Sequence, residues 1–296
     1  MNRIGRWADR NLKYLFTVPT ILFVLGMVLF PIVYTLVLSF YSWRGSVNVP
    51  REWMGLGNYV QMFTSSRFPM AMWRTFVYSA VALSLEVVLG IMIALLLNRT
   101  FFGKNLTKTA FLLPMVATPV AIGMVWKLIY EPTIGILNYV IRNWFGGPKI
   151  DYLGSTQNAL YALVAVDVWQ WTPMVMLVVL AGLTAISSEP YESAMVDGAT
   201  RWQITTKITL PLLRPTIFTA VLLRLIDVLK TFDILYSMTQ GGPGFATETM
   251  NILSYRQAFE FFEFGQASAS LVVFFVIVMA MAALTIRIKS RAEVDF

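Results

Sequence analysis

Six long apolar segments constrain this chain more than any other feature. Each is long enough to cross roughly 30 Å of hydrocarbon as a helix. Their approximate bounds are 14–41, 72–98, 109–130, 159–184, 212–237 and 267–288. Hydrophobic residues make up 57% of the chain and charged residues only 13%, about half the charged fraction of a soluble domain. The sequence therefore predicts an all-α membrane protein with six transmembrane helices in a single domain over residues 1–296.

The first apolar segment follows four basic residues, Arg3, Arg6, Arg10 and Lys13, so a signal peptide has to be considered. Its apolar run is too long for one, and the bulky run 40–43 offers no small-residue cleavage site. We therefore expect this segment to be a retained transmembrane helix.

Basic residues in the connecting segments predict the orientation. They are more frequent in the amino tail, the 99–108 loop, the 185–211 loop and the carboxyl tail than in the three intervening loops, at about 42–71, 131–158 and 238–266. Because the side richer in Lys and Arg faces the cytoplasm, both termini and the 185–211 loop are expected there. The same rule explains the net charge of +7 better than nucleic-acid binding does.

The absence of cysteine and histidine removes several kinds of chemistry. The chain cannot form disulfides, use thiol nucleophiles or His bases, or build His/Cys metal sites. It also contains no Walker A sequence for binding ATP. We expect a protein that is not an enzyme and carries no cofactor of its own.

The loop 185–211 is polar in an otherwise apolar half of the chain. Pro190 stands where a helix can begin, and Glu189, Glu192 and Asp197 carry negative charge that favours its first turns. Gly198 weakens such a helix by roughly 1 kcal/mol relative to alanine and allows a bend. By itself this pattern also fits an ordinary charged loop between two membrane helices.

The spacing of specific residues in this loop resembles the EAA loop of ABC importer permeases. Glu192-Ser193-Ala194 is followed by Gly198 and then by Ile208-Thr209-Leu210-Pro211, with Ser193 in place of the family's first alanine. The resemblance implies a type I ABC importer permease fold with a cytoplasmic helix that docks into a groove on an ATPase. It assigns coupling to the ATPase to Glu192, Ser193, Ala194, Asp197 and Gly198.

The fifth apolar segment carries charges of alternating sign, Arg224, Asp227, Lys230 and Asp233. Charged groups at membrane depth usually face a cavity or each other. One interpretation is a ladder of ion pairs within the helix, because residues three apart are neighbours. The other is a polar stripe facing a hydroxyl-rich solute, with Arg224, Asp227 and Thr231 on one face.

The fourth segment contains Asp167, Trp169, Gln170, Trp171 and Pro173. Indole faces stack on sugar rings while carboxylates and amides bond hydroxyl groups, and Pro173 can open a kink at a binding site. The alternative is an interfacial belt of tryptophans. Two further charges, Glu86 and Lys127, are expected to be structural and to face the bundle.

A second resemblance, to the carbohydrate-uptake branch of these permeases, rests on the run 232–243 and on Thr247-Glu248-Thr249. The maltose and trehalose importers are the nearest examples, and the chain resembles their first (maltose-type) permease partner. Position by position, the resemblance carries a substrate path onto Asp167, Gln170, Trp171, Met174, Arg224, Asp227, Val228 and Thr231. These identities differ from the maltose permease, and Arg224 allows an anionic or otherwise modified sugar.

Together the two resemblances imply a subunit of an ATP-driven sugar importer in a bacterial or archaeal plasma membrane. Its partners would be a second permease, an ATPase dimer that binds ATP and magnesium, and an external solute-binding protein. One alternative is a secondary transporter with Asp167 or Asp227 as the ion-coupling carboxylate, although the sequence shows no inverted repeat. Another is an intramembrane enzyme, for which the sequence offers no recognisable nucleophile and base.

Overall fold

The computed structural model describes residues 3–45 and 50–294, with the backbone alone for 3–10 and 291–294. Side chains of four basic residues expected in the cytoplasmic tails therefore lie outside the described part, namely Arg3, Arg6, Arg10 and Arg291. The chain divides into two compact units, residues 1–65 with 254–274 and residues 66–253 with 275–296. Each unit is described by itself below.

The first unit surrounds a buried amide. It contains α1 (Arg3–Leu38), β1 (Tyr41–Ser42), β2 (Glu52–Trp53), α2 (Gly57–Thr64), η2 (Arg256–Glu260) and the start of α13 (Phe264–Val294). The strands β1 and β2 pair antiparallel, with Tyr41 opposite Trp53. The Asn58 amide donates to the carbonyls of Ser39 and Tyr41 at 2.8 and 3.0 Å. Because these carbonyls follow the end of α1, Asn58 fixes the turn between α1 and β1.

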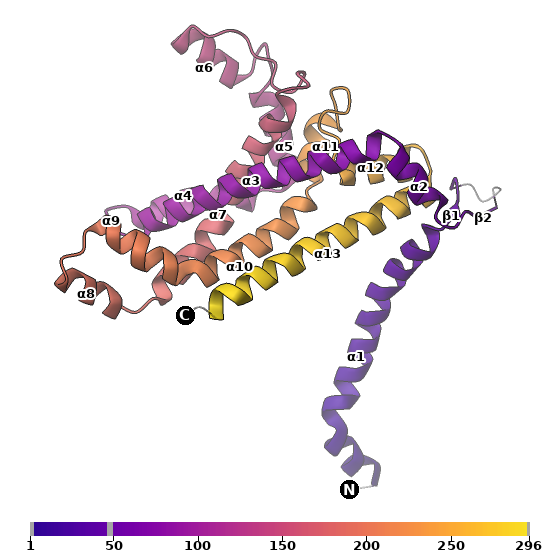
Figure 1. The fold of residues 1–296 in the computed structure, drawn as a ribbon, viewed down its shortest axis with the longest axis horizontal. Coiled ribbons are helices and arrows are strands. Elements are labelled where there is room, and N and C mark those ends of the chain that lie inside the picture. The colour runs from indigo at the N-terminus through magenta and orange to yellow at the C-terminus, as the bar shows by residue number, and fades with distance from the viewer. Residues whose placement is uncertain (1–2, 46–49, 295–296) are drawn as a thin grey trace. The chain divides into compact units, whose positions relative to one another are not determined.

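The second unit is a helical bundle built around α7 (Ala159–Ala185), which lies partly hidden behind its neighbours in Figure 1. Its neighbours in contact are α3 (Arg67–Leu97), α10 (Leu210–Leu229) and α4 (Lys104–Val116). Of the most apolar stretch of α7, 67% is buried, against 28% in α3. A β-carbon at Gly90 would lie 2.7 Å from the Val175 side chain, so this glycine permits the close approach of α3 to α7. The helix α7 is therefore the core of the unit, and it continues through Pro173.

Two expected helices are broken. The segment 109–130 consists of α4 and α5 (Pro119–Ile129), which meet at 98°. Because a residue before proline avoids helical geometry, Thr118 is extended, with φ −65° and ψ 141°. The segment 212–237 is divided likewise, between α10 and α11 (Asp233–Thr239).

Side-chain amides bind the backbone at both breaks. The amide of Gln170 donates to the carbonyl of Ala117, at 3.1 Å. The amide of Asn251, on α12 (Met250–Tyr255), donates to the carbonyls of Leu229 and Thr231, at 3.2 and 3.4 Å. Carbonyls left free where a helix ends need such donors when they lie away from water. The two breaks are thus supported features of the fold.

By length and composition, four helices in the described chain can cross a membrane. They are Asn11–Leu38, Arg67–Leu97, Ala159–Ala185 and Phe264–Ser290, and the bent pair α4 and α5 makes a fifth if it is one span. The fifth expected segment is not among them because α10, although 20 residues long, carries three charged residues, Arg214, Arg224 and Asp227. These charged side chains lower the mean hydropathy of α10, and the contacts that they make determine how α10 packs in the fold.

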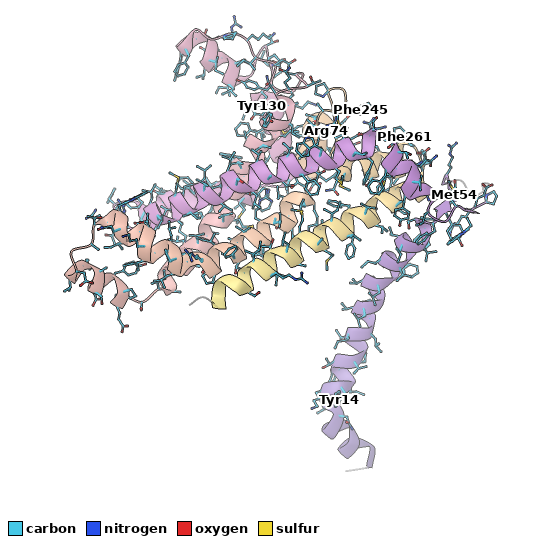
Figure 2. All side chains as sticks on the ribbon, in the orientation of Figure 1. Tyr14, Met54, Arg74, Tyr130, Phe245 and Phe261 are labelled. Atoms are coloured by element: carbon cyan, nitrogen blue, oxygen red, sulfur yellow. The ribbon has the colours of Figure 1, made fainter. Side chains whose placement is uncertain are left out.

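The segment between α5 and α7 contains α6 (Ile136–Phe145) and is tied together by polar side chains. Asn138 exchanges two hydrogen bonds of 2.9 Å with the backbone of Ile150. The Glu131 carboxylate accepts the N–H groups of Thr133 and Ile134 at 2.6 Å each, and these donors lower the pKa of Glu131. In Figure 2, Tyr130 lies at the end of α5, where its ring stacks on Tyr152.

Candidate functional site

A buried ion-pair cluster joins the three central helices of the second unit. The side chain of Arg224, on α10, is only 1% exposed. Its Nε donates to Glu86 Oε2 at 2.6 Å, and its Nη2 donates to Glu86 Oε1 at 2.9 Å. The same Nη2 also donates to Asp167 Oδ2. Because Glu86 belongs to α3 and Asp167 to α7, one guanidinium holds three helices together.

This cluster decides between the two interpretations of the charged fifth segment. Arg224 pairs across helices and not with Asp227, so no ladder runs the length of α10. Asp227 is instead 48% exposed and lies 3.7 Å from Lys230. The guanidinium already binds two carboxylates, and its pairing with an anionic sugar stays a prediction. Glu86 faces the bundle, as the sequence predicted.

A polar cavity of about 340 Å³ lies beside the cluster, between the two helix breaks. Its lining residues are Pro119, Trp171, Arg224, Asp227, Lys230, Thr231, Phe232, Asp233 and Ile234. The Arg224 guanidinium carbon is 5.3 Å from the centre of the Trp171 ring, so a cation–π contact orients the indole. The cavity thus combines an aromatic face with carboxylates, an amine and a hydroxyl group.

Four of the eight residues predicted to line a substrate path meet at this cavity: Trp171, Arg224, Asp227 and Thr231. The other four do not line it. Asp167 is buried against Arg224, Gln170 is bound to the Ala117 carbonyl, Val228 lies in the core and Met174 is half-buried. In this conformation Asp167, Gln170 and Val228 are buried in the protein interior and do not reach the cavity surface. A role in transport stays a prediction for all eight.

The two tryptophans of α7 have different surroundings. Trp171 lines the polar cavity, whereas Trp169 packs edge-on against Trp126 with ring centres 5.5 Å apart. Trp169 also lines an apolar groove that includes Phe111 and Pro173. Of these two tryptophans, Trp171 is therefore the one that faces polar groups, and Trp169 serves as its matched control. The predicted substrate path left out Lys230 and Phe232, which also line the cavity. The sequence did not show that α10 ends at Leu229 and that these residues form a break.

The motif Thr247-Glu248-Thr249 has a structural role in this fold. Glu248 is buried and accepts two hydrogen bonds from Arg67, at 2.8 and 2.6 Å. Thr247 donates to the Gly242 carbonyl at 2.8 Å. These contacts join the start of α3 to the segment before α12. No group of three or more His, Cys, Asp or Glu suited to a metal ion occurs in the described residues.

The predicted coupling loop contains the short helix α8 (Glu189–Val196) and, after a turn, α9 (Arg201–Ile204). Glu192 and Ser193 are exposed on α8, whereas Ala194 is buried. The turn after α8 is closed by the N–H of Ala199, which donates to the Ala194 carbonyl at 2.9 Å. A capping box between Thr200 and Gln203 then starts α9. The loop is thus a defined helical hairpin.

Three apolar side chains stand exposed on this hairpin. Met195 is 60% exposed, Val196 88% and Trp202 75%. The role predicted for this loop rested on its charges and its motif, and not on these apolar side chains. Exposed apolar residues beside acidic ones are typical of a surface that another protein covers. The hairpin therefore has the composition of a docking surface, and coupling to an ATPase stays a prediction for its residues.

Gly198 allows the turn between α8 and α9, since its φ is +74°. A β-carbon there would meet no atom within 4 Å, so the cost of a side chain is backbone strain of about 1–2 kcal/mol. We expect Gly198→Leu to lower uptake more than Ser193→Ala, an exposed change worth less than about 0.5 kcal/mol. Gly198→Asn is the matched control, because asparagine tolerates a left-handed backbone. Equal uptake by the leucine and asparagine variants would show that the turn geometry is unimportant.

Comparison with known proteins adds a family to this geometry. Residues 86–290 match the family described as binding-protein-dependent transport system inner membrane component. A probable ABC transporter permease protein of Sinorhizobium fredii is 38% identical over 271 residues, covering 90% of this chain and 86% of the relative. The trehalose/maltose transport system permease protein of Thermococcus litoralis is 32% identical over 284 residues, covering 96% and 95%.

A solved structure confirms the expected fold. A chain from the crystal structure of a bacterial ABC transporter that imports the acidic polysaccharide alginate superposes with a TM-score of 0.84. The match covers 98% of this chain and 99% of the other, at 24% sequence identity. The all-α type I importer permease fold predicted from the sequence is thus confirmed, while the orientation of the termini stays a prediction.

Proposed function

The chain belongs to the family of inner membrane components of binding-protein-dependent transport systems, and on that premise we propose that it carries a sugar or sugar derivative through an ATP-driven importer. The sugar class is supported by the relative named as a trehalose/maltose transport system permease. It is also supported by the cavity, where Trp171 offers an apolar face and Asp227 and Thr231 offer hydrogen-bonding groups.

We propose that this chain supplies only the membrane path. A second permease would complete it, and an ATPase dimer would bind ATP and magnesium and dock on the α8–α9 hairpin. An extracytoplasmic solute-binding protein would deliver the sugar to the opposite side. The excess of basic residues near the hairpin supports a cytoplasmic position for it and for both termini. The family supports a bacterial or archaeal plasma membrane as the location.

One observation carries the mechanism: the hairpin and the cavity share a continuous helical run. The helix α9, the π-helical turn η1 (Thr205–Thr209) and α10 follow one another without a break from Arg201 to Leu229. At 1.5 Å per residue, roughly 40 Å of helix joins the hairpin to Asp227. A movement of the docked hairpin would therefore shift the cavity lining directly. The breaks at Ala117–Thr118 and Lys230–Phe232 allow α5 and α11 to remain behind while α4 and α10 move.

The sugar must bind unequally to the two states for this movement to transport it. Trp171 lies on α7 and Thr231 lies in the break that follows α10. A relative shift of α7 and α10 would therefore separate the groups that bind the sugar. Arg224 would limit that shift, because it ties α10 to both α3 and α7. On this proposal the ion-pair cluster stays intact during the movement, and Trp171, Asp227 and Thr231 change their positions relative to one another.

The test compares Trp171→Ala with Trp169→Ala in the assembled importer in proteoliposomes. Loss of a stacking face worth about 1.4 kcal/mol should raise the KM for sugar uptake about tenfold for Trp171→Ala. Trp169→Ala removes the same side chain from an apolar groove and should leave KM near the wild-type value. Equal KM values for the two variants would refute the path. Uptake that needs an ion gradient but no internal ATP would favour the secondary transporter.

A further inference from the structure

We propose that the second unit holds a binding site for a phosphate-bearing anion, between the end of α3 and the α8–α9 hairpin. A cavity of about 210 Å³ lies there, separate from the polar cavity beside Arg224. Its polar lining comes from Asn98, Arg99, Tyr191, Arg201, Thr205 and Thr209. These residues belong to α8, α9, η1 and the residues that follow α3, so the cavity connects the hairpin to the bundle.

The charge of the lining is one-sided. Arg99 and Arg201 contribute two positive charges, and the lining contains no Asp or Glu. Within the described chain neither arginine forms an ion pair, whereas Arg67, Arg224 and Arg256 each bind a carboxylate. Both arginines are solvent-exposed, and an anion in the cavity would be attracted by two positive charges at once. The site therefore favours a negatively charged ligand.

The hydrogen-bonding groups point to the same ligand class. Arginine presents a planar fork of N–H donors that matches the oxygens of a phosphate. The Asn98 amide and the Tyr191 hydroxyl add neutral donors to the same cavity. The Thr205 hydroxyl donates to the Arg201 carbonyl at 2.9 Å, which helps to fix the start of α9. A phosphate has enough oxygens to use both guanidinium groups and the neutral donors together.

A purely structural explanation accounts for only half of the site. Arg99 follows the carboxyl end of α3, where the helix dipole stabilises a cation. Arg201 stands at the opposite end of its helix, as the first residue of α9, where the dipole disfavours a cation. Arg201 thus occupies a position that is unfavourable for its own helix, in a cavity that it shares with Arg99. A ligand that binds both arginines explains this placement.

The position of the site suggests what binding would do. Arg201 and Thr205 lie on the helical run that leads through α10 to Asp227, and Asn98 and Arg99 follow the end of α3. An anion bound to Arg99 and Arg201 together would hold the hairpin against the end of α3. It would therefore oppose movement of the hairpin. This inference concerns the hairpin and not the sugar, so it can fail while the proposed transport function stands. The anion can come from a phospholipid headgroup or from a soluble phosphate compound, and the experiment separates these sources.

The experiment measures thermal unfolding of the assembled importer in nanodiscs. One arm uses phosphatidylcholine nanodiscs titrated with inorganic phosphate, with sodium chloride at equal ionic strength as the reference. The other compares phosphatidylcholine with nanodiscs containing half phosphatidylglycerol. Binding to the folded state should raise Tm by about 2–4 °C near tenfold saturation. A rise in the first arm identifies a soluble phosphate, and a rise in the second alone identifies a lipid headgroup.

The variants decide whether this cavity is responsible. Arg99→Gln/Arg201→Gln should abolish the rise in Tm. Lys104→Gln/Lys108→Gln removes the same amount of charge from α4, outside the cavity lining, and should preserve the rise in Tm. Should the glutamine variant not assemble, Arg201→Lys keeps the charge but loses the fork, and should reduce the rise at least by half. An equal rise in all variants, or no rise in either arm, would overturn the proposal.

Discussion

Arg224→Gln is expected to destabilise the assembled permease by about 3–5 kcal/mol, because it leaves two carboxylates buried without their cation. Glu86 and Asp167 are 0% exposed, so water cannot replace the guanidinium. The change also removes the hydrogen bonds that join α10 to α3 and α7. Thermal unfolding of the purified complex measures the loss, with Asp227→Asn as the control. Since Asp227 is half exposed, its variant should unfold close to the wild-type temperature.

The formal charges of the cluster make the prediction sharper. With both carboxylates ionised, one arginine and two carboxylates give the wild-type cluster a formal net charge of −1. Arg224→Gln changes this to −2, whereas Glu86→Gln changes it to zero and leaves Arg224 paired with Asp167. We therefore expect Arg224→Gln to lower Tm clearly more than Glu86→Gln. If Glu86→Gln proves the more damaging, shape and hydrogen-bond geometry matter more here than charge.

The sequence predicted the long helices well and their interruptions poorly. Apolar segments at 72–98 and 159–184 correspond to α3 and α7, since long apolar runs in a membrane have few alternatives to a helix. Proline did not identify the breaks by itself. Pro173 lies inside the continuous helix α7, where neighbouring helices support the backbone on several sides. Pro119 instead starts α5 after an extended Thr118, and Gln170 supplies the donor for the freed carbonyl.

The partner of Arg224 could not be chosen from the sequence. Asp227 lies three residues away on the same helix, and local spacing made it as eligible as any distant carboxylate. The signal that could have helped is the isolation of Glu86 and Asp167, each a single carboxylate within an apolar helix. Charges at membrane depth usually pair with each other, so the two isolated carboxylates are natural partners for an arginine in a neighbouring helix. Only the packing of α3, α7 and α10 shows that they meet.

Glu192→Lys is expected to lower sugar-stimulated ATP hydrolysis and uptake by tenfold or more, while the permease remains inserted and assembled. Glu192 lies exposed in the first turn of α8, close in sequence to the exposed Met195 and Val196. A lysine there would place a positive charge at the positive end of the helix dipole. It would also oppose the basic groups that the family resemblance implies on the ATPase. Reversing a charge within an interface costs about 2–5 kcal/mol, more than a tenfold effect needs.

The control for this variant is Glu52→Lys, which reverses an exposed carboxylate on β2, far along the chain from the hairpin. Both variants change the net charge equally, so a general effect on insertion or lipid binding would appear in both. ATP hydrolysis with and without the sugar-loaded binding protein, measured in proteoliposomes beside uptake, separates coupling from assembly. Glu192→Lys should keep basal hydrolysis only if the ATPase remains bound, and co-purification reports that directly. Normal stimulation in Glu192→Lys would remove this residue, and with it the acidic start of α8, from the docking surface.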